Sequence, residues 1–203
     1  RGKVPALLAS TKRGDIYVLD RRDGKLVVPA PEQPVPQGAA TGDRTSPTQP
    51  FSALSFKPPA LRERDMWGTT PFDQLICRIT FKRLRYEGIF TPPSEQGSLI
   101  YPGDLGVFDW GGIAVDPVRQ LAILNPDYMA FVSKLIPRAE FDARGGAGSE
   151  QGVHPMTGTP FAVDLHPLLS PLGIPCQAPP WGYLAAVDLN TMQRVWMHRN
   201  GTI

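Results

Sequence analysis

The stretch Trp110-Gly-Gly-Ile-Ala-Val-Asp-Pro117, continued by Leu121-Ala-Ile-Leu-Asn-Pro126, decides what kind of fold this sequence makes. Aliphatic runs on both sides of Asp116-Pro117 predict two β-strands joined by a tight turn. The two glycines beside Trp110 let backbone approach a flat partner closely, and Asn125 places an amide donor and acceptor where the second strand ends. A buried hairpin with a packing tryptophan would show the same pattern, so these residues alone leave a binding role open.

The composition is that of an ordinary soluble globular chain, with 203 residues, 41% hydrophobic and 20% charged. The 23 prolines and 20 glycines together make up about a fifth of it. This favours short strands joined by turns and long loops over a helical bundle. A net charge of +2 implies no nucleic-acid partner and no anionic-membrane footprint for the chain as a whole. No apolar run reaches the roughly 18 residues of a membrane span.

The two ends and the two cysteines give weaker information. The chain opens Arg1-Gly2-Lys3 and closes Asn200-Gly201-Thr202-Ile203, just after a predicted strand. We expect it to be an internal segment of a longer protein. Cys77 and Cys176 allow at most one disulfide, and the sequence leaves open whether their sulfur atoms meet.

A similar hairpin pattern occurs near both ends of the chain. In each copy an aspartate, Asp20 or Asp188, can accept hydrogen bonds from turn amides, and in the second copy Trp196 can wedge between neighbouring sheets. Repeated units that cannot bury their own faces predict a radial or stacked β-array. The predicted strands are 4–10, 15–20 and 25–28 in the first copy, and 182–188 and 193–196 in the second.

The copies stand further apart than one propeller blade of roughly 40–50 residues, so the length between them must contain insertions. We place these at about 29–101 and 137–180, with a further strand over 128–134. The first insertion is predicted to contain one short helix over 71–85. In the second, we expect 145–148 to be flexible and 168–175 to be a nonpolar loop that packs over the sheet. The apolar face of the helix carries Phe72, Leu75, Ile76, Ile79 and Leu84. Its basic side is predicted to be the solvated face, and a partner-binding role for it stays open. This side carries Arg78, Lys82, Arg83 and Arg85.

Few local motifs carry chemistry. The sequence has no glycine-rich phosphate loop and no Gly-x-Ser-x-Gly elbow. The three histidines, His154, His166 and His198, lack metal-site spacing with the cysteines. Lys12 stands between a strand and the turn Arg13-Gly14, where a lysine is usually solvated, and a ligand-binding role for it stays open.

Six longer strings carry a family resemblance. They are Lys12-Arg-Gly-Asp-Ile-Tyr-Val-Leu-Asp-Arg-Arg-Asp-Gly24, Val35-Pro-Gln-Gly-Ala-Ala40, Arg85-Tyr-Glu-Gly-Ile-Phe-Thr-Pro-Pro-Ser-Glu-Gln-Gly97, Trp110-Gly-Gly-Ile-Ala-Val-Asp-Pro117, Ser133-Lys-Leu-Ile-Pro-Arg138 and Pro175-Cys-Gln-Ala-Pro-Pro-Trp-Gly-Tyr183. They resemble the membrane-bound glucose, quinate and shikimate dehydrogenases of bacteria that depend on pyrroloquinoline quinone (PQQ). The resemblance covers nearly the whole chain, and Met192 departs from the usual glycine of the blade-closing motif.

The resemblance implies a mainly β fold, part of an eight-bladed quinoprotein β-propeller with the quinone on its axis. Residues 1–203 would be about two blades plus insertions of one periplasmic PQQ-binding domain. The parent would have an anchor in the bacterial inner membrane, oxidise a sugar or polyol of the glucose type and pass electrons to ubiquinone. The resemblance also implies a divalent cation, calcium or magnesium. No residue of this chain matches the family's cation ligands or its general base, which are expected before residue 1.

Residue by residue, Lys12 matches the family lysine that faces the ortho-carbonyl oxygens of the quinone. A cation there stabilises negative charge during reduction. Asn125 matches the family asparagine that hydrogen-bonds the cofactor. Trp110 and Gly111, followed by Gly112, precede it on the adjoining segment, and we expect Trp110 and Gly111 to contact the cofactor, with packing within the blade as the alternative.

Two alternatives stay open. The first is a quinate or shikimate dehydrogenase of the same family, because some strings look more like that branch and others more like the glucose branch. The second is a propeller that only scaffolds other proteins, against which the presence of both Lys12 and Asn125 argues. Two unclosed blades would also leave sheet edges exposed, so we expect the isolated chain to self-associate.

Overall fold

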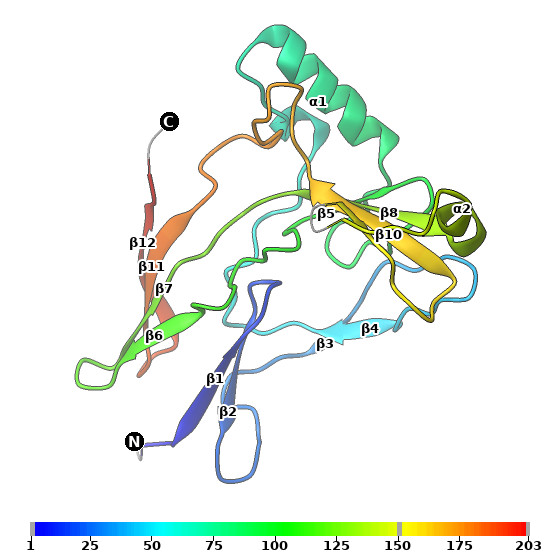
Figure 1. Ribbon diagram of the computed structural model, residues 1–203. Coiled ribbons are helices and arrows are strands. Elements are labelled where there is room, and N and C mark those ends of the chain that lie inside the picture. Colours follow the sequence, from blue (N-terminus) through cyan, green and yellow to red (C-terminus); the bar gives the residue numbers. More distant parts are fainter. Residues whose placement is uncertain (1–2, 150–151, 202–203) are drawn as a thin grey trace.

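The computed structural model describes residues 3–149 and 152–201, and Figure 1 shows the course of the chain. The outermost residues of both ends quoted above, 1–2 and 202–203, lie outside this description. Within it the chain is mainly β, in two four-stranded sheets and two two-stranded sheets. The prediction of a mainly β fold is confirmed.

The first four-stranded sheet contains both predicted hairpins of the C-terminal part. Its strand order is β12-β11-β7-β6, and all its neighbours are antiparallel. Asp116 Oδ1 accepts hydrogen bonds of 2.9 Å from the amides of Val118 and Arg119, which closes the predicted Asp-Pro turn. Asp188 Oδ1 likewise accepts a hydrogen bond of 2.7 Å from the amide of Asn190. The strands are β6 (Ile113–Asp116), β7 (Leu121–Leu124), β11 (Tyr183–Asp188) and β12 (Gln193–Arg199).

The N-terminal hairpin pairs β1 (Ala6–Ser10) with β2 (Ile16–Asp20). The third predicted strand, 25–28, is wrong: only Leu26 forms an isolated bridge, to Leu19. The proline-rich segment that begins at Pro29 explains this, because proline has no amide hydrogen with which to continue a ladder. The hairpin and the first sheet share one core, since Ile16 and Val18 belong to the same buried cluster as Leu124 and Val187.

The two insertions fold together into a second body, which the sequence does not predict. Its sheet has the order β5-β8-β10-β9. The strand predicted at 128–134 forms as β8, but it pairs here and not with the 113–124 hairpin. The connection between the paired strands β7 and β11 therefore runs over 125–182, and it contains a helix and two strands that the sequence does not predict. The elements are β5 (Ser98–Ile100), β8 (Phe131–Pro137), α2 (Arg138–Ala143), β9 (Gly152–His154) and β10 (Phe161–Pro167), with β3 (Glu32–Pro34) and β4 (Thr48–Pro50) forming a separate pair.

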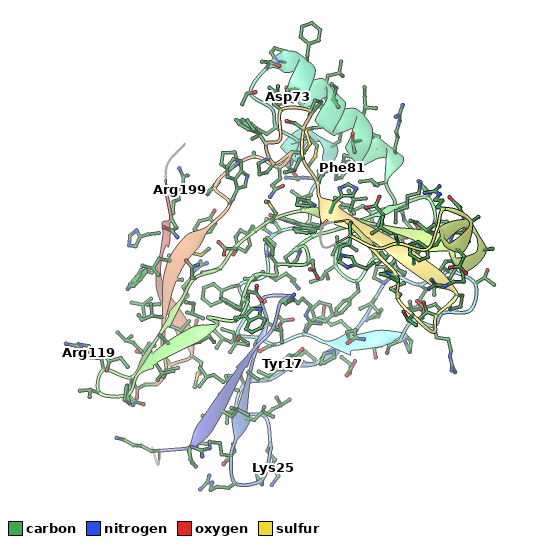
Figure 2. The ribbon with its side chains drawn as sticks, in the orientation of Figure 1. Tyr17, Lys25, Asp73, Phe81, Arg119 and Arg199 are labelled. Carbon is green, nitrogen blue, oxygen red and sulfur yellow. A yellow bond between two sulfur atoms is a disulfide. The ribbon has the colours of Figure 1, made fainter. Side chains whose placement is uncertain are left out.

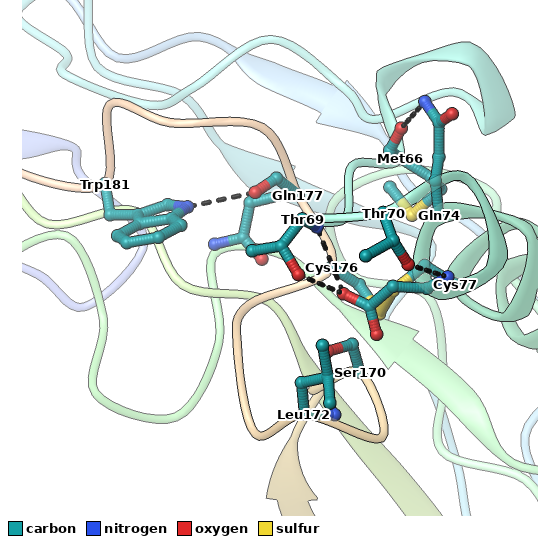
Figure 3. Close-up of a disulfide and its surroundings, with 11 residues drawn as sticks. Met66, Thr69, Thr70, Gln74, Cys77, Ser170, Leu172, Cys176, Gln177 and Trp181 are labelled. Carbon is teal, nitrogen blue, oxygen red and sulfur yellow. Dashed lines mark hydrogen bonds between the residues drawn. A yellow bond between two sulfur atoms is a disulfide. The ribbon is translucent and has the colours of Figure 1, made fainter. Parts of the chain in front are cut away.

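The helix predicted in the first insertion forms as α1 (Pro71–Arg83), preceded by the 3-10 turn η1 (Glu63–Asp65). It begins with the Thr70 side chain, which accepts a 3.1 Å bond from the Asp73 amide. Cys77 on α1 forms a disulfide with Cys176 of the other insertion, which settles the open pairing (Figure 3).

The predicted orientation of α1 is wrong. The side that meets the body carries the buried residues Asp73 and Cys77, and Phe81 packs against the same cluster (Figure 2). The four apolar residues of the predicted inner face within the helix are exposed: Phe72, Leu75, Ile76 and Ile79. Amphipathic spacing identifies a face, but it does not say which face the rest of the fold covers. Across the described ranges, no helix has the length and apolar character needed to cross a bilayer.

Candidate functional site

Three chain segments that carry the predicted site residues meet at one end of the first sheet. Lys12 follows β1, Gly111 precedes β6, and Asn125 follows β7. Because Ile113 pairs with Leu124, the start of β6 and the end of β7 lie at the same end. The backbone of Val107 links the segment of Lys12 to the segment of Asn125. Its amide donates a hydrogen bond to the Lys12 carbonyl at 2.7 Å, and its carbonyl accepts one from the Asp127 amide at 3.0 Å.

Lys12 presents a half-exposed ammonium group at this end. Its Nζ donates to the Asp104 carbonyl at 2.6 Å and lies 3.8 Å from Asp104 Oδ1. The side chains of Lys12 and Asp104 are 56% and 54% exposed, so this ion pair is weak and can exchange for another anion. The close approach needs Gly106, which has φ +80°, since a Cβ there would lie 2.6 Å from the Cα of Lys12.

Arg13 anchors the loop that carries Lys12, and sequence reasoning missed it. Its guanidinium lies 2.5 Å from Asp15 Oδ2, donates to the Pro50 carbonyl at 2.6 Å and contacts the Tyr17 hydroxyl. It is also placed over two aromatic rings, 4.9 Å from the centroid of Phe51 and 4.7 Å from that of Phe90. Both rings come from the first insertion, so no local pattern in the sequence signals this cluster.

A cavity of about 200 Å³ lies beside Lys12 and Arg13. The rest of its wall comes from the first insertion and the loop after β5, at 88–91 and 99–103. Burial raises the pKa of Tyr101, which lines this cavity, so its hydroxyl stays protonated and able to donate. The first insertion therefore forms one wall of the space that the lysine borders.

A second groove, of about 300 Å³, is lined by both Gly111 and Asn125. No atom lies within 4 Å of where a Cβ of Gly111 would stand, so that face of the backbone is open. Asn125 Oδ1 accepts a long hydrogen bond of 3.4 Å from Asn200 Nδ2, which holds the amide only weakly. Desolvation raises the pKa of Asp127, another residue of the groove wall.

The structure thus brings Gly111 and Asn125 into one groove and leaves Lys12 in another cavity, which shares no lining residue with that groove. Trp110 lines neither and is 98% exposed, so it meets no partner for its ring within the described ranges. In the same ranges, no group of three or more histidine, cysteine, aspartate or glutamate side chains could hold a metal ion.

Comparison with known proteins identifies the family. A family model described as "PQQ: Glucose/ethanol/alcohol dehydrogenase, beta-propeller domain" matches residues 1–203. The chain belongs to this PQQ β-propeller family. The incomplete β-array seen here, one four-stranded sheet beside the hairpin β1–β2, is accordingly a part of a propeller.

Relatives within the PQQ family include sugar and cyclic-acid dehydrogenases. The chain is 59% identical over 208 residues to a quinoprotein glucose dehydrogenase of Escherichia coli (strain K12), covering 98% of the chain and 26% of that protein. It is 42% identical over 207 residues to a quinate/shikimate dehydrogenase (quinone) of Acinetobacter baylyi, again covering 98% of the chain and 26% of the relative. The chain therefore spans about a quarter of the length of these curated relatives.

One solved structure is also similar to this PQQ-family chain. It is the crystal structure of quinohemoprotein alcohol dehydrogenase from Comamonas testosteroni, with 18% sequence identity and a TM-score of 0.46. The match covers 97% of this chain and 22% of the other.

Proposed function

We propose that the chain is part of a quinoprotein dehydrogenase that oxidises a hydroxyl of a glucose-type sugar with PQQ and passes the electrons to ubiquinone. The observation that carries the choice of substrate is the identity of 59% to a quinoprotein glucose dehydrogenase, against 42% to a quinate/shikimate dehydrogenase. The remaining three quarters or so of such a parent would supply the general base and the ligands of a divalent cation, calcium or magnesium. Residues 1–203 would be one piece of its periplasmic domain, in a protein of the bacterial inner membrane.

The residues present fit the cofactor. The ammonium of Lys12 is half-exposed and paired only with an exposed carboxylate, so it is available to the carbonyl oxygens of a quinone, which gain negative charge as the quinone is reduced. In a second groove, Asn125 offers a weakly held amide and Gly111 offers an open backbone face. Bound PQQ would supply the redox chemistry, which no side chain of this chain provides.

Each residue then has a distinct task. Lys12 stabilises the charge that develops on the ortho-carbonyl oxygens, Asn125 orients the ring system, and Gly111 lets it approach the backbone. Trp110, whose ring is free on both faces in the described chain, contacts the cofactor or the adjoining part of the parent.

The experiment is Lys12→Ala in the full-length parent, with Lys12→Arg as its matched control. We expect the alanine variant to lose at least about a hundredfold in dye-linked turnover and to bind PQQ more weakly, while the arginine variant, which keeps the charge, retains most of the affinity. An unchanged circular dichroism spectrum would show that the fold is intact. Full activity of the alanine variant would contradict the assignment of Lys12.

Quinate or shikimate is the second candidate substrate, favoured by the relative at 42% identity. Dye-linked oxidation by the parent, loaded with PQQ and a divalent cation, separates the two when glucose and quinate are compared. Turnover of glucose alone supports the first proposal, and turnover of quinate alone replaces it with the second. Failure of the parent to bind PQQ at all would favour a scaffold without catalysis. The 203-residue chain by itself should give no turnover, because it lacks matches to the family's base and cation ligands.

A further inference from the structure

Helix α1 exposes a continuous apolar face, which we call the α1 stripe: Phe72, Leu75, Ile76 and Ile79. Their exposures are 81%, 51%, 44% and 42%. The spacing of three, four and seven residues from Phe72 places all four on one side of the helix. Single exposed apolar residues are ordinary on a protein surface, but these four form one continuous apolar strip that the chain's own fold leaves uncovered.

The α1 stripe cannot turn inward. On the opposite side, Cys77 is fully buried and joined to Cys176 by the disulfide. Asp73 is 4% exposed, and the side chain of Gln74 donates to the Met66 carbonyl at 3.1 Å. Figure 3 shows these contacts on the inner side of the helix. The structure therefore holds the stripe rigidly toward the outside, where Figure 1 places α1 at the periphery of the molecule.

Basic residues accompany the α1 stripe. Lys82 follows Leu75 by seven residues, and Arg83 follows Ile79 by four. These spacings place both cations on the same side of α1 as the stripe, at its C-terminal end. Around α1 and η1, five cations (Arg62, Arg64, Arg78, Lys82 and Arg83) stand against three carboxylates (Glu63, Asp65 and Asp73). Arg78 and Lys82 share Glu63, at 2.8 and 3.0 Å, whereas the described residues contain no acidic partner for Arg83. The surroundings of the stripe are thus basic, although the whole chain carries only +2.

The size of the stripe decides what covers it. A helix of 13 residues is about 20 Å long, and a strip about 10 Å wide along it offers on the order of 200 Å². Stable protein interfaces need about 800 Å² from each partner, so neither a second copy nor another folded protein would be held by this face. A lipid surface has no such threshold, because an amphipathic helix needs only to sink its apolar side to the level of the headgroups.

We propose that α1 lies flat on an anionic phospholipid surface. Phe72, Leu75, Ile76 and Ile79 enter the boundary between headgroups and acyl chains, and Lys82 and Arg83 contact the lipid phosphates. The disulfide fixes the angle at which the rest of the molecule stands on that surface. This inference is independent of the proposed catalytic function, since it rests on a different element and has a readout without turnover.

The test is flotation of the 203-residue chain with phosphatidylcholine vesicles that contain or lack phosphatidylglycerol. We expect the chain to float with the vesicles that contain phosphatidylglycerol, and high salt to weaken this. Phe72→Ser/Ile76→Ser should lower the partition coefficient at least about tenfold. The matched control is Val115→Ser/Val118→Ser, which removes two other exposed apolar side chains, 47% and 88% exposed, in the other sheet and should leave partitioning unchanged. Arg83→Glu should weaken binding to the anionic vesicles and not to the neutral ones.

Three outcomes would overturn the proposal. The first is unaltered flotation of the Phe72→Ser/Ile76→Ser variant, and the second is an equal loss in the control variant. The third is a chain that does not bind vesicles but forms dimers, if the Phe72→Ser/Ile76→Ser variant no longer forms them. That result would show that the α1 stripe binds a second copy of the chain. Unchanged circular dichroism and a retained disulfide show that each variant is folded.

Discussion

Arg13 and Asp15 form a buried ion pair next to the lysine that we assign to the quinone. Their side chains are 12% and 0% exposed, with 2.5 Å between the guanidinium and Asp15 Oδ2. A buried carboxylate that loses its cation stays desolvated without compensation, and such a loss costs about 3–5 kcal/mol. We therefore expect Arg13→Met to lower the free energy of unfolding of the chain by about 3 kcal/mol or more.

A double-mutant cycle in urea with Asp15→Asn measures this coupling. When the carboxylate is neutralised as well, the penalty for an unpaired charge disappears, so the double variant should be more stable than the sum of the two single losses implies. Additive losses would mean that the aromatic contacts of Arg13, and not the ion pair, hold this loop.

At the level of single residues, the sequence indicates Lys12 through a long string that resembles the family, and Asn125 through its position shortly after another such string, 110–117. It gives no sign of Arg13. The partners of that residue lie at Pro50, Phe51 and Phe90, and only the folding of the first insertion brings them over the hairpin. Long-range contacts between irregular segments have no periodicity to detect.

Among the elements, the turn between β11 and β12 carries backbone strain. Met192 has φ +57°, in the left-handed region, while its amide donates to the Asp188 carbonyl at 2.7 Å. A side chain in this conformation costs on the order of 1 kcal/mol relative to glycine. Because Met192 also packs against the main core, the informative comparison is between two variants that both remove its side chain.

We expect Met192→Gly to be more stable than Met192→Ala by about 1 kcal/mol in thermal or urea unfolding. The neighbouring Thr191 is exposed and is not among the residues with positive φ, so Thr191→Gly should be less stable than Thr191→Ala. If glycine were more stable than alanine at both positions, the left-handed backbone would not be the reason that glycine is favoured at position 192.

The disulfide joins the two insertions, since Cys77 and Cys176 are 99 residues apart in sequence. Closing a loop of that length stabilises a fold by about 3–5 kcal/mol, mainly through the unfolded chain. Cys77→Ala/Cys176→Ala should therefore destabilise the chain by about this amount, measured by urea unfolding. Hydrogen exchange should quicken in α1, while β7 and β11, which lie in the other sheet, stay protected. Equal acceleration in all strands would show that the two bodies open as one unit.

The elements with strong local signals are those that the sequence predicts: the Asp-Pro turn, the hairpin of 182–188 with 193–196, and the helix expected at 71–85, which forms over 71–83. The sheet β5-β8-β10-β9 escapes prediction because β5 and β9 are only three residues long and come from different insertions. The orientation of α1 could not be predicted for a different reason. Which face of an amphipathic helix is buried depends on what packs against it, and here Cys77 and its disulfide hold the less apolar side inward.

At the scale of the whole molecule, the chain has two main cores built around different sheets. The first sheet and the hairpin β1–β2 share the propeller-type core, and the two insertions build the second body around Leu99 and the disulfide. Lys12 lies where the two meet, since its cavity is walled by the first insertion. The first insertion therefore shapes the space beside Lys12.

The open outer strands of the first sheet set the association state of the isolated chain. β12, at one edge of the order β12-β11-β7-β6, is seven residues long and offers unpaired backbone groups along its outer side. We expect the apparent mass in sedimentation equilibrium to rise with protein concentration as such edges pair. Val195→Lys, which places a charge on this strand where the valine is 56% exposed, should weaken the association. Val118→Lys adds the same charge in the turn between β6 and β7 and should have no effect. If both lysine variants weaken association equally, general charge repulsion governs the association, and edge pairing does not. A chain that stays monomeric at all concentrations would show that the edge of β12 is already protected.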